Sequence, residues 1–384
     1  MARRHPIFTD EHDMLRDSLR SFIEKELAPH AEAWEQQGCF PHDEVFKRLG
    51  ELGFLGITLP EKYGGADAGF VSSIVFSEEM VGCNSGGVGA SIGLHTNIAL
   101  PYIADLGTEE QKQKYLIPGT KGELIGSLGV TEPGAGSDVA SIRTSAVRDG
   151  DAYVINGSKM FITNGGTADY VILAVKTDRD AEHAGISLFL VDKGTPGFVV
   201  SRDLDKLGWR TCNTAELAFD NVRVPRSAML GEKDRGFYHI MAHFQEERLY
   251  LAVGSVAGAQ KALELASEYA KERVQFGRPI ANFQVTRHKI ADMATEIEAA
   301  RQLVYNTIRL HIEQEDCQAE VAMCKLYACE MATRVMNEAI QIFGGYGYMM
   351  ECPVQRMWRD ARINTIGGGT SEIQREIIGR LMLR

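Results

Sequence analysis

The chain has 384 residues, with 41 Lys and Arg against 52 Asp and Glu, which gives a formal net charge of −11 at pH 7. That length is too great for one compact core and indicates two or three structural units. Hydrophobic residues at 44% and charged residues at 24% are ordinary for a globular protein and exclude wholesale disorder. The acidic balance argues against a surface for nucleic acid or for an anionic membrane.

The amino terminus and the cysteines indicate a reduced protein of the cytoplasmic, bacterial type. Residues 1–6 are basic, but acidic residues follow from Asp10 without an apolar segment, so a secretory signal is not expected. No stretch approaches the roughly 20 apolar residues of a membrane-spanning helix. The 7 cysteines are scattered and never stand in C-x-x-C spacing, and no His/Cys cluster predicts a metal site.

Residues 1–125 are predicted to form a first, helical unit. Apolar residues recur there at steps of three and four, the spacing of one face of an amphipathic helix. These residues are Leu15, Leu19, Phe22, Ile23 and Leu27. Pro29 follows the strongest part of this stripe, and Pro60 to Gly65 form an evident loop. We expect helices or short irregular pieces to continue to about Leu124.

A segment of this unit, Gly89-Ala90-Ser91-Ile92-Gly93, matches the G-x-S-x-G pattern of serine hydrolases. In that motif a strained strand-to-helix turn exposes a nucleophilic serine, which requires a strand before Ser91. The segment lies instead among helices and is rich in small residues, so a close helix contact is the simpler interpretation. A hydrolase that uses Ser91 stays as an alternative.

Residues 126–235 show the pattern of a β unit. Short runs rich in β-branched and aromatic residues are separated by turn signals. The runs are 153–155, 170–175, 186–191, 198–200 and 217–219. Asn156-Gly157 separates the first run from Lys159 to Ile162, which is a typical hairpin signal. Strands that do not alternate with helices predict an antiparallel sheet or barrel and not a Rossmann unit.

Residues 236–384 return to the helical period. One stripe of apolar and small residues runs from Phe237 to Gly258, and a second runs from Val321 to Ile342. Gly344-Gly345 is predicted to end the second helix. The order of helical, β and helical segments therefore predicts three units, with boundaries after residues 125 and 235.

The segment with most chemical information is the loop from Leu128 to Asp138, LGVTEPGAGSD. It is dense in backbone donors and hydroxyls, and its glycines let a planar or phosphorylated ligand approach closely. The chain has neither G-x-G-x-x-G after a predicted strand nor G-x-x-x-x-G-K-[ST], so no standard dinucleotide or P-loop site is indicated. Four further segments accompany the loop. They are Lys159 to Gly165, Glu272 to Gly277, Gln341 to Gly347 and Gly367 to Arg375.

These five segments, in this order, closely resemble those of the acyl-CoA dehydrogenase family, and the resemblance covers essentially the whole chain. It implies an α+β fold with an N-terminal helical domain, a middle antiparallel β-barrel and a C-terminal four-helix bundle. It implies FAD as the cofactor, bound in a cleft between the barrel and the C-terminal helices. It also implies a homodimer or homotetramer, because cofactor sites are shared between subunits, and an electron-transfer flavoprotein as electron acceptor.

The resemblance assigns the FAD-binding residues motif by motif. Those expected around the flavin ring and the pyrophosphate are Leu128, Thr131, Ser137, Phe161 and Thr163, with Phe161 stacked beside the ring. Those expected to reach the FAD of a neighbouring subunit are Arg273, Gln275, Phe276 and Gln284. Their partner segment is expected to contain Gln341, Gly344 and Gly345, and the loop over the cofactor Thr370 and Glu372.

The implied reaction removes hydrogens from Cα and Cβ of an acyl-CoA thioester and leaves a trans-2-enoyl-CoA. It needs a general base for the α-proton and donors on the thioester oxygen, one of which the resemblance places at the backbone N–H of Gly368. Many family members carry the catalytic Glu at this position, where this chain has glycine.

Glu247 is the base that the resemblance to the long-chain and isovaleryl-type members implies. It follows Phe244 and precedes Leu251 on the apolar stripe, where a solvent-facing glutamate would be misplaced. Burial beside substrate should raise its pKa. From the residues alone, an ion pair with Arg248 is the competing interpretation, and Glu246 is an alternative base one position out of register.

Gly367 and Gly368 replace bulkier residues of the medium-chain members, which leaves room beside the reacting carbons. We therefore expect long-chain or branched-chain acyl groups. The expected substrate contacts are Ser137, Tyr238, Arg248, Gly367 and Gly368. The alternative functions are an O₂-reactive flavin oxidase or monooxygenase of the same superfamily and an acyl-CoA hydrolase that uses Ser91.

Overall fold

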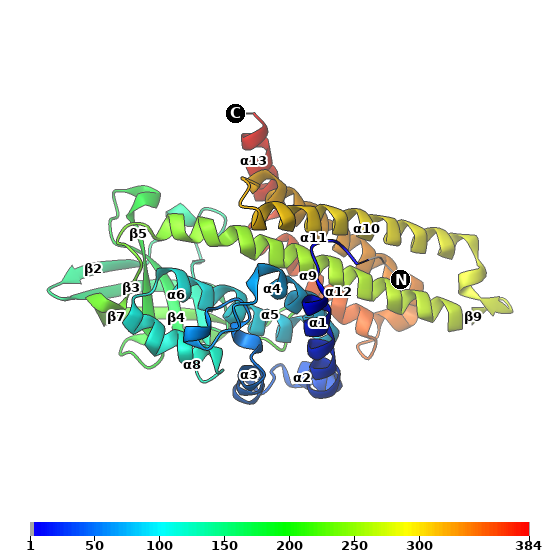
Figure 1. Cartoon of the computed structure of the whole chain (residues 1–384), viewed down its shortest axis with the longest axis horizontal. Helices are drawn as coiled ribbons and strands as arrows, with labels where there is room; N and C mark the ends of the chain where they lie inside the picture. Colours follow the sequence, from blue (N-terminus) through cyan, green and yellow to red (C-terminus); the bar gives the residue numbers. More distant parts are fainter. Residues whose placement is uncertain (1–3, 384) are drawn as a thin grey trace.

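A computed structural model describes residues 4–383, which form an elongated molecule with the β sheet at one end and long helices at the other (Figure 1). Helices run from Asp10 to Thr120, strands from Gly126 to Leu230, and helices dominate again from Gly236. The predicted order of helical, β and helical segments is confirmed. The division into three units after residues 125 and 235 remains our proposal.

The N-terminal helices start with α1 (Asp10–Phe22), whose acidic first turn suits the positive end of the helix dipole. The predicted apolar stripe is buried from Leu19 to Leu27, and it continues through a turn of π-helix at Ile23–Leu27. The other α-helices of this part are α2 (Ala31–Gln37), α3 (His42–Glu51), α4 (Gly69–Glu79), α5 (Gly86–Leu94), α6 (Leu100–Leu106), α7 (Glu109–Gln111) and α8 (Ile117–Thr120).

The middle part is one sheet of eight strands in the order β6-β7-β3-β2-β4-β5-β8, with β1 beside β4. The strands are β1 (Gly126–Gly129), β2 (Ser145–Asp149), β3 (Ala152–Thr163), β4 (Tyr170–Lys176), β5 (Ile186–Asp192), β6 (Phe198–Asp203), β7 (Thr214–Pro225) and β8 (Met229–Leu230). Two features correct the expected antiparallel barrel. β4 pairs in parallel with β1 and with β2. The edge strands β6 and β8 are not paired with each other in the described part of the chain, since β8 has only 2 residues, so the sheet is not closed.

The predicted hairpin at Asn156-Gly157 is wrong, because β3 runs through this dipeptide as one strand of 12 residues. The register against β7 shifts between Ile155 and Gly157, as at a β-bulge. Gly157 has φ 149°, and a Cβ there would lie 2.5 Å from Thr144 Oγ1. The glycine therefore serves a bulge and a close approach to Thr144, and not a turn.

The C-terminal part is built on three long helices, α9 (Gly236–Glu272), α10 (Gln284–Ile312) and α11 (Gln318–Phe343). A small hairpin of β9 (Val274–Gln275) and β10 (Arg278–Pro279) joins α9 to α10. The shorter α12 (Pro353–Ala361) and α13 (Ser371–Met382) pack against α11, and the end of α13 projects from the molecule (Figure 1). Gly344, at φ 59°, ends α11 as predicted. The expected four-helix bundle is thus three long helices with two short ones.

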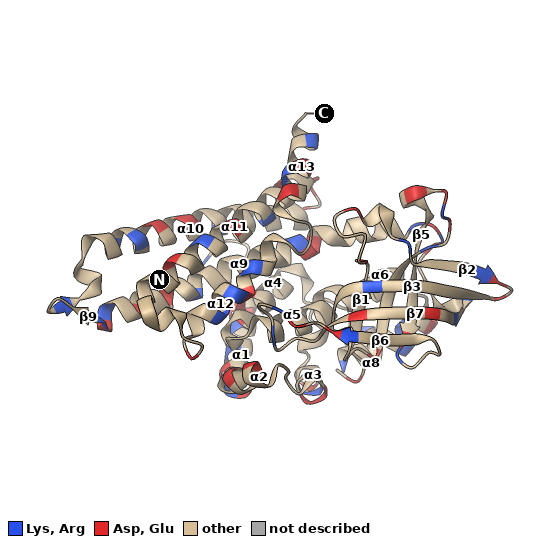
Figure 2. Cartoon of the chain, turned by 180° about the vertical axis from the view of Figure 1, so that it is seen from behind, with Lys and Arg blue, Asp and Glu red and all other residues tan. Residues whose placement is uncertain are grey.

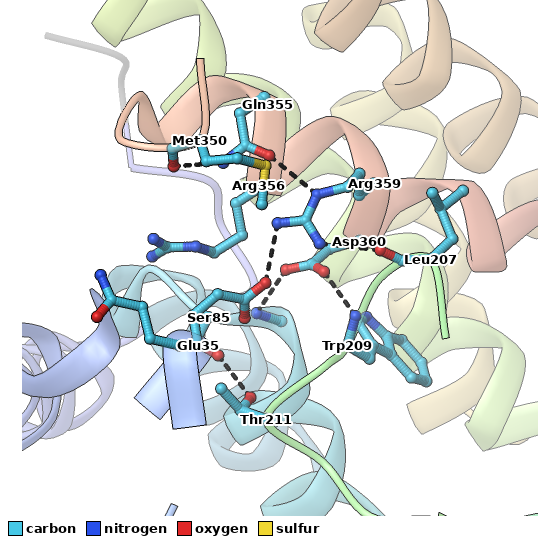
Figure 3. Close-up of polar contacts among 12 residues, drawn as sticks. Glu35, Ser85, Leu207, Trp209, Thr211, Met350, Gln355, Arg356, Arg359 and Asp360 are labelled. Atoms are coloured by element: carbon cyan, nitrogen blue, oxygen red, sulfur yellow. Dashed lines mark hydrogen bonds and ion pairs between the residues drawn. The ribbon is translucent and has the colours of Figure 1, made fainter. Parts of the chain in front are cut away.

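A buried carboxylate joins three distant parts of the chain at the start of α5 (Figure 3). Asp360 on α12 accepts hydrogen bonds from the backbone N–H of Gly86 at 2.9 Å and of Trp209 at 2.6 Å. Burial raises the pKa of Asp360 to about 6, and the two backbone donors oppose this rise. The carboxylate therefore fixes α5 and the segment between β6 and β7 to α12.

Arg359, beside this carboxylate, extends the same junction to α2. Its guanidinium pairs with Glu35 at 2.9 Å and donates to the carbonyl of Leu207 at 2.9 Å and to Gln355 Oε1 at 2.9 Å (Figure 3). Arg359, Glu35 and Gln355 are buried, and each polar group that is taken from water needs such partners. The N-terminal, β and C-terminal segments therefore meet in one satisfied polar junction.

Three further features concern the cysteines, metal ligands and membrane spans. All 7 cysteines are free. Within residues 4–383, no group of His, Cys, Asp and Glu side chains could hold a metal ion, and no helix is long and apolar enough to cross a membrane. Basic and acidic residues are interspersed along α10 and α11 (Figure 2).

Candidate active site

Glu247 lies in α9 with its carboxyl group turned into the protein. Its Oε1 atom is buried and has no hydrogen-bond partner among the described residues. Burial is the largest reason why the pKa of Glu247 is raised from 4.5 to about 8, and the charge of Arg248 opposes this rise. A buried carboxyl without a partner that titrates close to neutral pH is suited to exchange a proton with a bound molecule.

The residues on either side of Glu247 have partners of their own. Glu246 Oε1 lies 3.1 Å from His311 Nε2 on α10. The buried Arg248 donates from Nε to the carbonyl of Gly368 at 3.3 Å. Arg248 thus engages a loop, while Oε1 of Glu247 stays free. This arrangement favours Glu247 over Glu246 as the reactive carboxyl and disfavours a simple Glu247–Arg248 ion pair.

Tyr102 on α6 also belongs to this site, although the sequence analysis did not single it out. Its hydroxyl is fully buried and, like Glu247 Oε1, lacks a partner in the described part of the chain. The ring stacks on that of His243, one helical turn before Glu247, with centroids 3.9 Å apart. Burial, and then the charge of Glu247, raise the pKa of the Tyr102 hydroxyl well above its usual range. A tyrosine after Pro101 in an apolar helix carries no signal in the sequence.

The glycine loop before α13 faces the same region. Gly368 and Gly369 have φ 64° and 92°, which is backbone that favours glycine. A Cβ on Gly368 would lie 2.7 Å from Cδ1 of Leu251, one turn after Glu247 on α9. The loop position that carries the catalytic Glu in many family members is therefore adjacent to the place where this chain has Glu247.

The loop after β1 and the end of β3 lie side by side and bring the first predicted cofactor group together. The Thr131 carbonyl accepts from the Met160 N–H at 2.9 Å, and the Thr163 carbonyl accepts from the Ser127 hydroxyl at 2.6 Å. Phe161, close to both, has φ 62° and is 67% exposed. A large aromatic ring left exposed on strained backbone is typical of a binding site.

The rest of this group fits a planar cofactor such as a flavin. Leu128 is partly buried against the core, and Ser137 is exposed in the loop. A Cβ on Gly134 or Gly136 would meet no atom within 4 Å, so the loop leaves open space at these two glycines. An exposed ring, hydroxyl groups and accessible backbone are the donor set that a flavin with its pyrophosphate requires.

A buried ion pair holds this loop against β3. Lys159 Nζ lies 2.8 Å from Glu132 Oε1, and Glu132 also accepts from the backbone N–H groups of Arg143 and Thr144. Burial lowers the pKa of Lys159 to about 8, and the charge of Glu132 opposes this fall. Removal of either partner would leave a buried charge, so the pair fixes the loop.

Ser91 is not the nucleophile of a hydrolase. It lies inside α5, is fully buried and donates to Asn164 Oδ1 at 2.6 Å. The Asn164 side chain in turn donates to the Ser91 carbonyl at 2.9 Å. Because no strand precedes Ser91, the strand-to-helix turn that the motif needs does not exist. The pair instead anchors the end of β3, directly after Thr163.

The second predicted cofactor group surrounds a cavity of about 420 Å³ at the far end of α9. Arg273 and Gln275 line it from the hairpin, and Gly344 and Gly345 line it from the end of α11. The Arg273 guanidinium lies 5.7 Å from the centre of the Tyr346 ring. A cation, an amide and open glycine backbone around a cavity fit a phosphate-bearing ligand.

The remaining predicted residues lie at the surface around these groups. Phe276 is 92% exposed at the hairpin tip, and Gln284 and Gln341 are exposed at the start of α10 and in the last turn of α11. Tyr238, in the first turn of α9, lies under the Arg235 guanidinium at 4.3 Å.

At the start of α13, the Thr370 side chain accepts from the Ile373 N–H and caps the helix. Glu372 is exposed in its first turn, where a carboxylate suits the helix dipole. Gly367, which precedes the two strained glycines, has open space on its Cβ side, with Ile363 as its nearest neighbour at 3.7 Å.

One chain does not bring the two cofactor groups together. From Glu247 to Arg273 is 26 positions along α9, or about 39 Å at the rise of an α-helix. Figure 1 shows the β9 hairpin and the sheet with β3 at opposite ends of the molecule. The Glu247 carboxyl group is therefore remote from the cavity at Arg273, and so is the sheet that carries Phe161.

Sequence patterns of acyl-CoA dehydrogenases match three consecutive parts of the chain. The pattern described as acyl-CoA dehydrogenase, N-terminal domain, matches residues 9–123. The middle-domain pattern matches residues 127–222, and the C-terminal-domain pattern matches residues 234–383.

Curated relatives are similar over nearly the full length. Acyl-CoA dehydrogenase of Bacillus subtilis (strain 168) is 44% identical over 375 residues, which cover 98% of each chain. The mitochondrial long-chain specific acyl-CoA dehydrogenase of Mus musculus is 41% identical over 376 residues, which cover 97% of this chain and 87% of the relative. The mitochondrial isovaleryl-CoA dehydrogenase of Solanum tuberosum is 42% identical over 383 residues, which cover 98% of this chain and 92% of the relative.

Solved structures share the fold. Acyl-CoA dehydrogenase from Geobacillus kaustophilus has a TM-score of 0.96 at 44% identity and covers 99% of this chain and 100% of its own. Butyryl-CoA dehydrogenase from Megasphaera elsdenii has a TM-score of 0.94 at 40% identity. A chain described with the electron transferring flavoprotein of Acidaminococcus fermentans has a TM-score of 0.94 at 39% identity. In both cases the match covers 100% of this chain and 100% of the other chain. The chain therefore belongs to the acyl-CoA dehydrogenase family of FAD-dependent oxidoreductases.

Proposed function

We propose that the chain dehydrogenates long-chain or branched-chain acyl-CoA thioesters and that Glu247 is its general base. The observation that carries this proposal is the Oε1 atom of Glu247, which is buried and has no hydrogen-bond partner among residues 4–383, in a carboxyl group whose pKa burial raises to about 8. Carboxylate oxygens that serve only structure are paired when they are buried, so a buried Oε1 without a partner points to chemistry.

In this proposal the carboxylate form of Glu247 takes the α-proton of the thioester. Negative charge then develops on the thioester oxygen, and the backbone N–H of Gly368 would stabilise it. When bound, FAD accepts the hydride from Cβ. Leu128, Thr131, Phe161 and Thr163 would hold the flavin, with Ser137 shared between cofactor and substrate.

The substrate class follows from the space around the glycine loop. A Cβ on Gly367 would meet Ile363 at ordinary contact distances of 3.7 and 3.9 Å, whereas one on Gly368 would lie 2.7 Å from Leu251 Cδ1, so of these two glycines Gly367 leaves more room. We propose that a long or branched acyl group uses the volume beside Gly367, with Tyr238 and Arg248 as further contacts. The long-chain and isovaleryl relatives support this choice, while the butyryl-CoA dehydrogenase is equally similar in fold.

The assembly is part of the proposal. The groups that contain Phe161 and Arg273 both fit parts of a dinucleotide cofactor, yet β3, which carries Phe161, and the β9 hairpin beside Arg273 lie at opposite ends of the molecule (Figure 1). In an oligomer, the group that contains Arg273 in one copy of the chain would meet the group that contains Phe161 in another copy. We therefore propose a homodimer at least, or a homotetramer, with Gln284, Gln341 and Phe276 at the shared site. An electron-transfer flavoprotein is the proposed acceptor, and the cytoplasm the proposed location.

A panel of acyl-CoA substrates tests the function. The FAD-loaded protein is mixed anaerobically with straight chains of 4 to 16 carbons and with branched acyl-CoAs, and flavin absorbance is followed. We expect the fastest bleaching with long or branched chains. Preference for the four-carbon chain would overturn the substrate class, and no bleaching with any member would overturn the activity.

Two further readings of the same panel separate the alternatives. Rapid reoxidation of the reduced protein in air, without an acceptor protein, would indicate the oxidase alternative. Release of free CoA without any electron acceptor would indicate hydrolysis, which the burial of Ser91 already opposes.

A further inference from the structure

Lys325 on α11 is a fully buried lysine without an acidic partner. Its side chain is 0% exposed, and burial lowers the pKa of its ammonium group. The lysines that form ion pairs among the described residues do not include it. They are Lys62, Lys114, Lys159, Lys233, Lys271 and Lys289. A buried lysine is almost always paired, so this exception needs an explanation.

The one hydrogen bond of Lys325 goes to the glycine loop. Its Nζ donates to the carbonyl of Gly369 at 2.6 Å. The buried Gln374 donates from Nε2 to the carbonyls of Gly368 and Gly369 at 3.3 Å and 3.1 Å, and Arg248 Nε donates to the first of them at 3.3 Å. Three buried donors from three helices therefore hold two consecutive peptide units.

These peptide units need to be held, because both glycines have left-handed backbone and neither has a side chain to pack. In a planar trans peptide the carbonyl of one residue fixes the direction of the N–H of the next, so these donors fix the N–H groups of Gly369 and Thr370. Because Gly368 Cα joins the first held peptide to the one that carries the Gly368 N–H, they also restrict the orientation of that N–H. The loop packs against Leu251, one turn from Glu247, and so lies at the reacting centre of the proposed function.

Charge gives a second reason for a lysine at this place. Arg248 and Lys325 are two buried cations, and the charge of Glu247 acts on Arg248. A fixed positive charge in a site that excludes water favours negative charge that develops nearby on a substrate. A hydrocarbon side chain would fill the same volume without this effect.

We propose that Lys325, acting with Gln374, is a positioning residue for the dehydrogenation: its ammonium group holds the Gly368–Gly369 backbone in the orientation in which the loop stabilises the enolate-like thioester. The inference rests on the proposed function. A residue that only supported the fold would change stability and leave the rate of the chemical step unchanged.

Three variants of the FAD-loaded enzyme test the proposal. Lys325→Met keeps length and volume but cannot donate, and Lys325→Arg keeps a charged donor. Lys261→Met is the matched control, because it makes the same change on a partly exposed lysine of α9. For each we would measure the rate of flavin reduction at saturating acyl-CoA, the KM and the midpoint of thermal unfolding.

We expect Lys325→Met to lower the rate at saturating acyl-CoA by about 10- to 100-fold. This is the effect expected from the loss of one charge-assisted hydrogen bond that is strongest in the transition state. The KM should change by less than about threefold. Lys325→Arg should restore most of the rate, and Lys261→Met should match the wild type.

Two readouts do not depend on hydride transfer. An acyl-CoA with sulfur in place of the β-carbon keeps its α-hydrogens, and their exchange with D₂O should slow in Lys325→Met by the same factor as the rate. Amide hydrogen exchange of peptides that cover residues 367–374 should become faster in the protein without substrate.

The proposal is overturned if Lys325→Met keeps the rate and the α-proton exchange within about twofold of the wild type, or if only KM changes. If Lys325→Met does not fold, Gln374→Met tests the same loop from α13, with the same expected loss and the same refuting result. If none of the acyl-CoAs reduces the flavin of the wild-type protein, the proposed function is refuted instead. The amide exchange of residues 367–374 would still report on the loop in that case.

Discussion

Replacement of Glu247 by Gln should inactivate the enzyme and at the same time stabilise it above pH 8. The pKa of this carboxyl group is raised from 4.5 to about 8 in the folded chain, chiefly by burial. Between these two values the folded protein binds a proton that the unfolded chain has lost, so the free energy of unfolding falls as the pH rises. Below about pH 4.5 both states are protonated and the effect vanishes.

The magnitude follows from the same two values. The pKa rises from 4.5 to about 8, and each unit corresponds to about 1.4 kcal/mol. Above pH 8 the charged carboxyl therefore lowers the free energy of unfolding of the wild type by at most about 5 kcal/mol. Relaxation of the site in the charged form reduces it, and half of this value would still raise the melting temperature by several degrees. A neutral glutamine of the same shape does not carry this penalty.

The assay is thermal unfolding of the FAD-loaded wild type and variant at pH 5 and pH 9, together with flavin reduction by acyl-CoA. We expect equal melting temperatures at pH 5, a more stable variant at pH 9, and a loss of about 10²- to 10⁴-fold in the reduction rate. In the wild type, kcat/KM should rise about tenfold for each pH unit up to about pH 8, because only the carboxylate accepts a proton.

The control is Glu246→Gln, which removes a neighbouring carboxyl that is bonded to His311 and partly exposed. It should show neither the pH-dependent stabilisation nor the large loss of rate. If Glu247→Gln and the wild type differ by the same amount at both pH values, the carboxyl is not buried as described; if the variant still reduces its flavin at nearly the wild-type rate, Glu247 is not the base.

Two further predictions concern the glycine loop and the junction between the parts. Gly368→Glu in the Glu247→Gln background should not restore flavin reduction, because Gly368 has left-handed backbone and a Cβ there would lie 2.7 Å from Leu251 Cδ1. Addition of Leu251→Ala should restore a measurable part of the rate. Recovery of the rate without Leu251→Ala would contradict the geometry. Arg359→Met should lower the free energy of unfolding, measured by denaturant titration, by about 3–5 kcal/mol, because Glu35 is left buried and unpaired. Arg380→Met removes an exposed ion pair and should change the same free energy by less than about 1 kcal/mol.

What the sequence predicted correctly depends on local periodicity. The stripe that includes Leu19 and Phe22, the three-part order of the elements and the helix end at Gly344 are properties of neighbouring residues, and the structure confirms them. Glu247 was identified on the same basis, because its position on an apolar stripe already implied burial, although its role as base rests on the family resemblance.

What the sequence could not predict depends on partners far along the chain. Asn156-Gly157 has the composition of a turn and of a bulge alike, and contact with Thr144 decides between them. Ser91 has the right neighbours for a nucleophile but the wrong elements around it. Tyr102 and Lys325 carry no local signal, because the groups that give them a role lie far along the chain, Glu247 on α9 and Gly369 in the loop before α13.

The junction of Glu35, Arg359 and Asp360 has a consequence for how the chain folds during synthesis. The ion pair spans 324 positions, and α12 is among the last elements to leave the ribosome. Until then, the carboxylate on α2 and the N–H of Gly86 on α5 have no partners, so the early helices cannot complete their packing. Contacts between such distant positions form late and slowly. A truncated product that lacks α12 would therefore keep an open, poorly packed N-terminal region that cellular proteases recognise, and only full-length chains would reach the closed state.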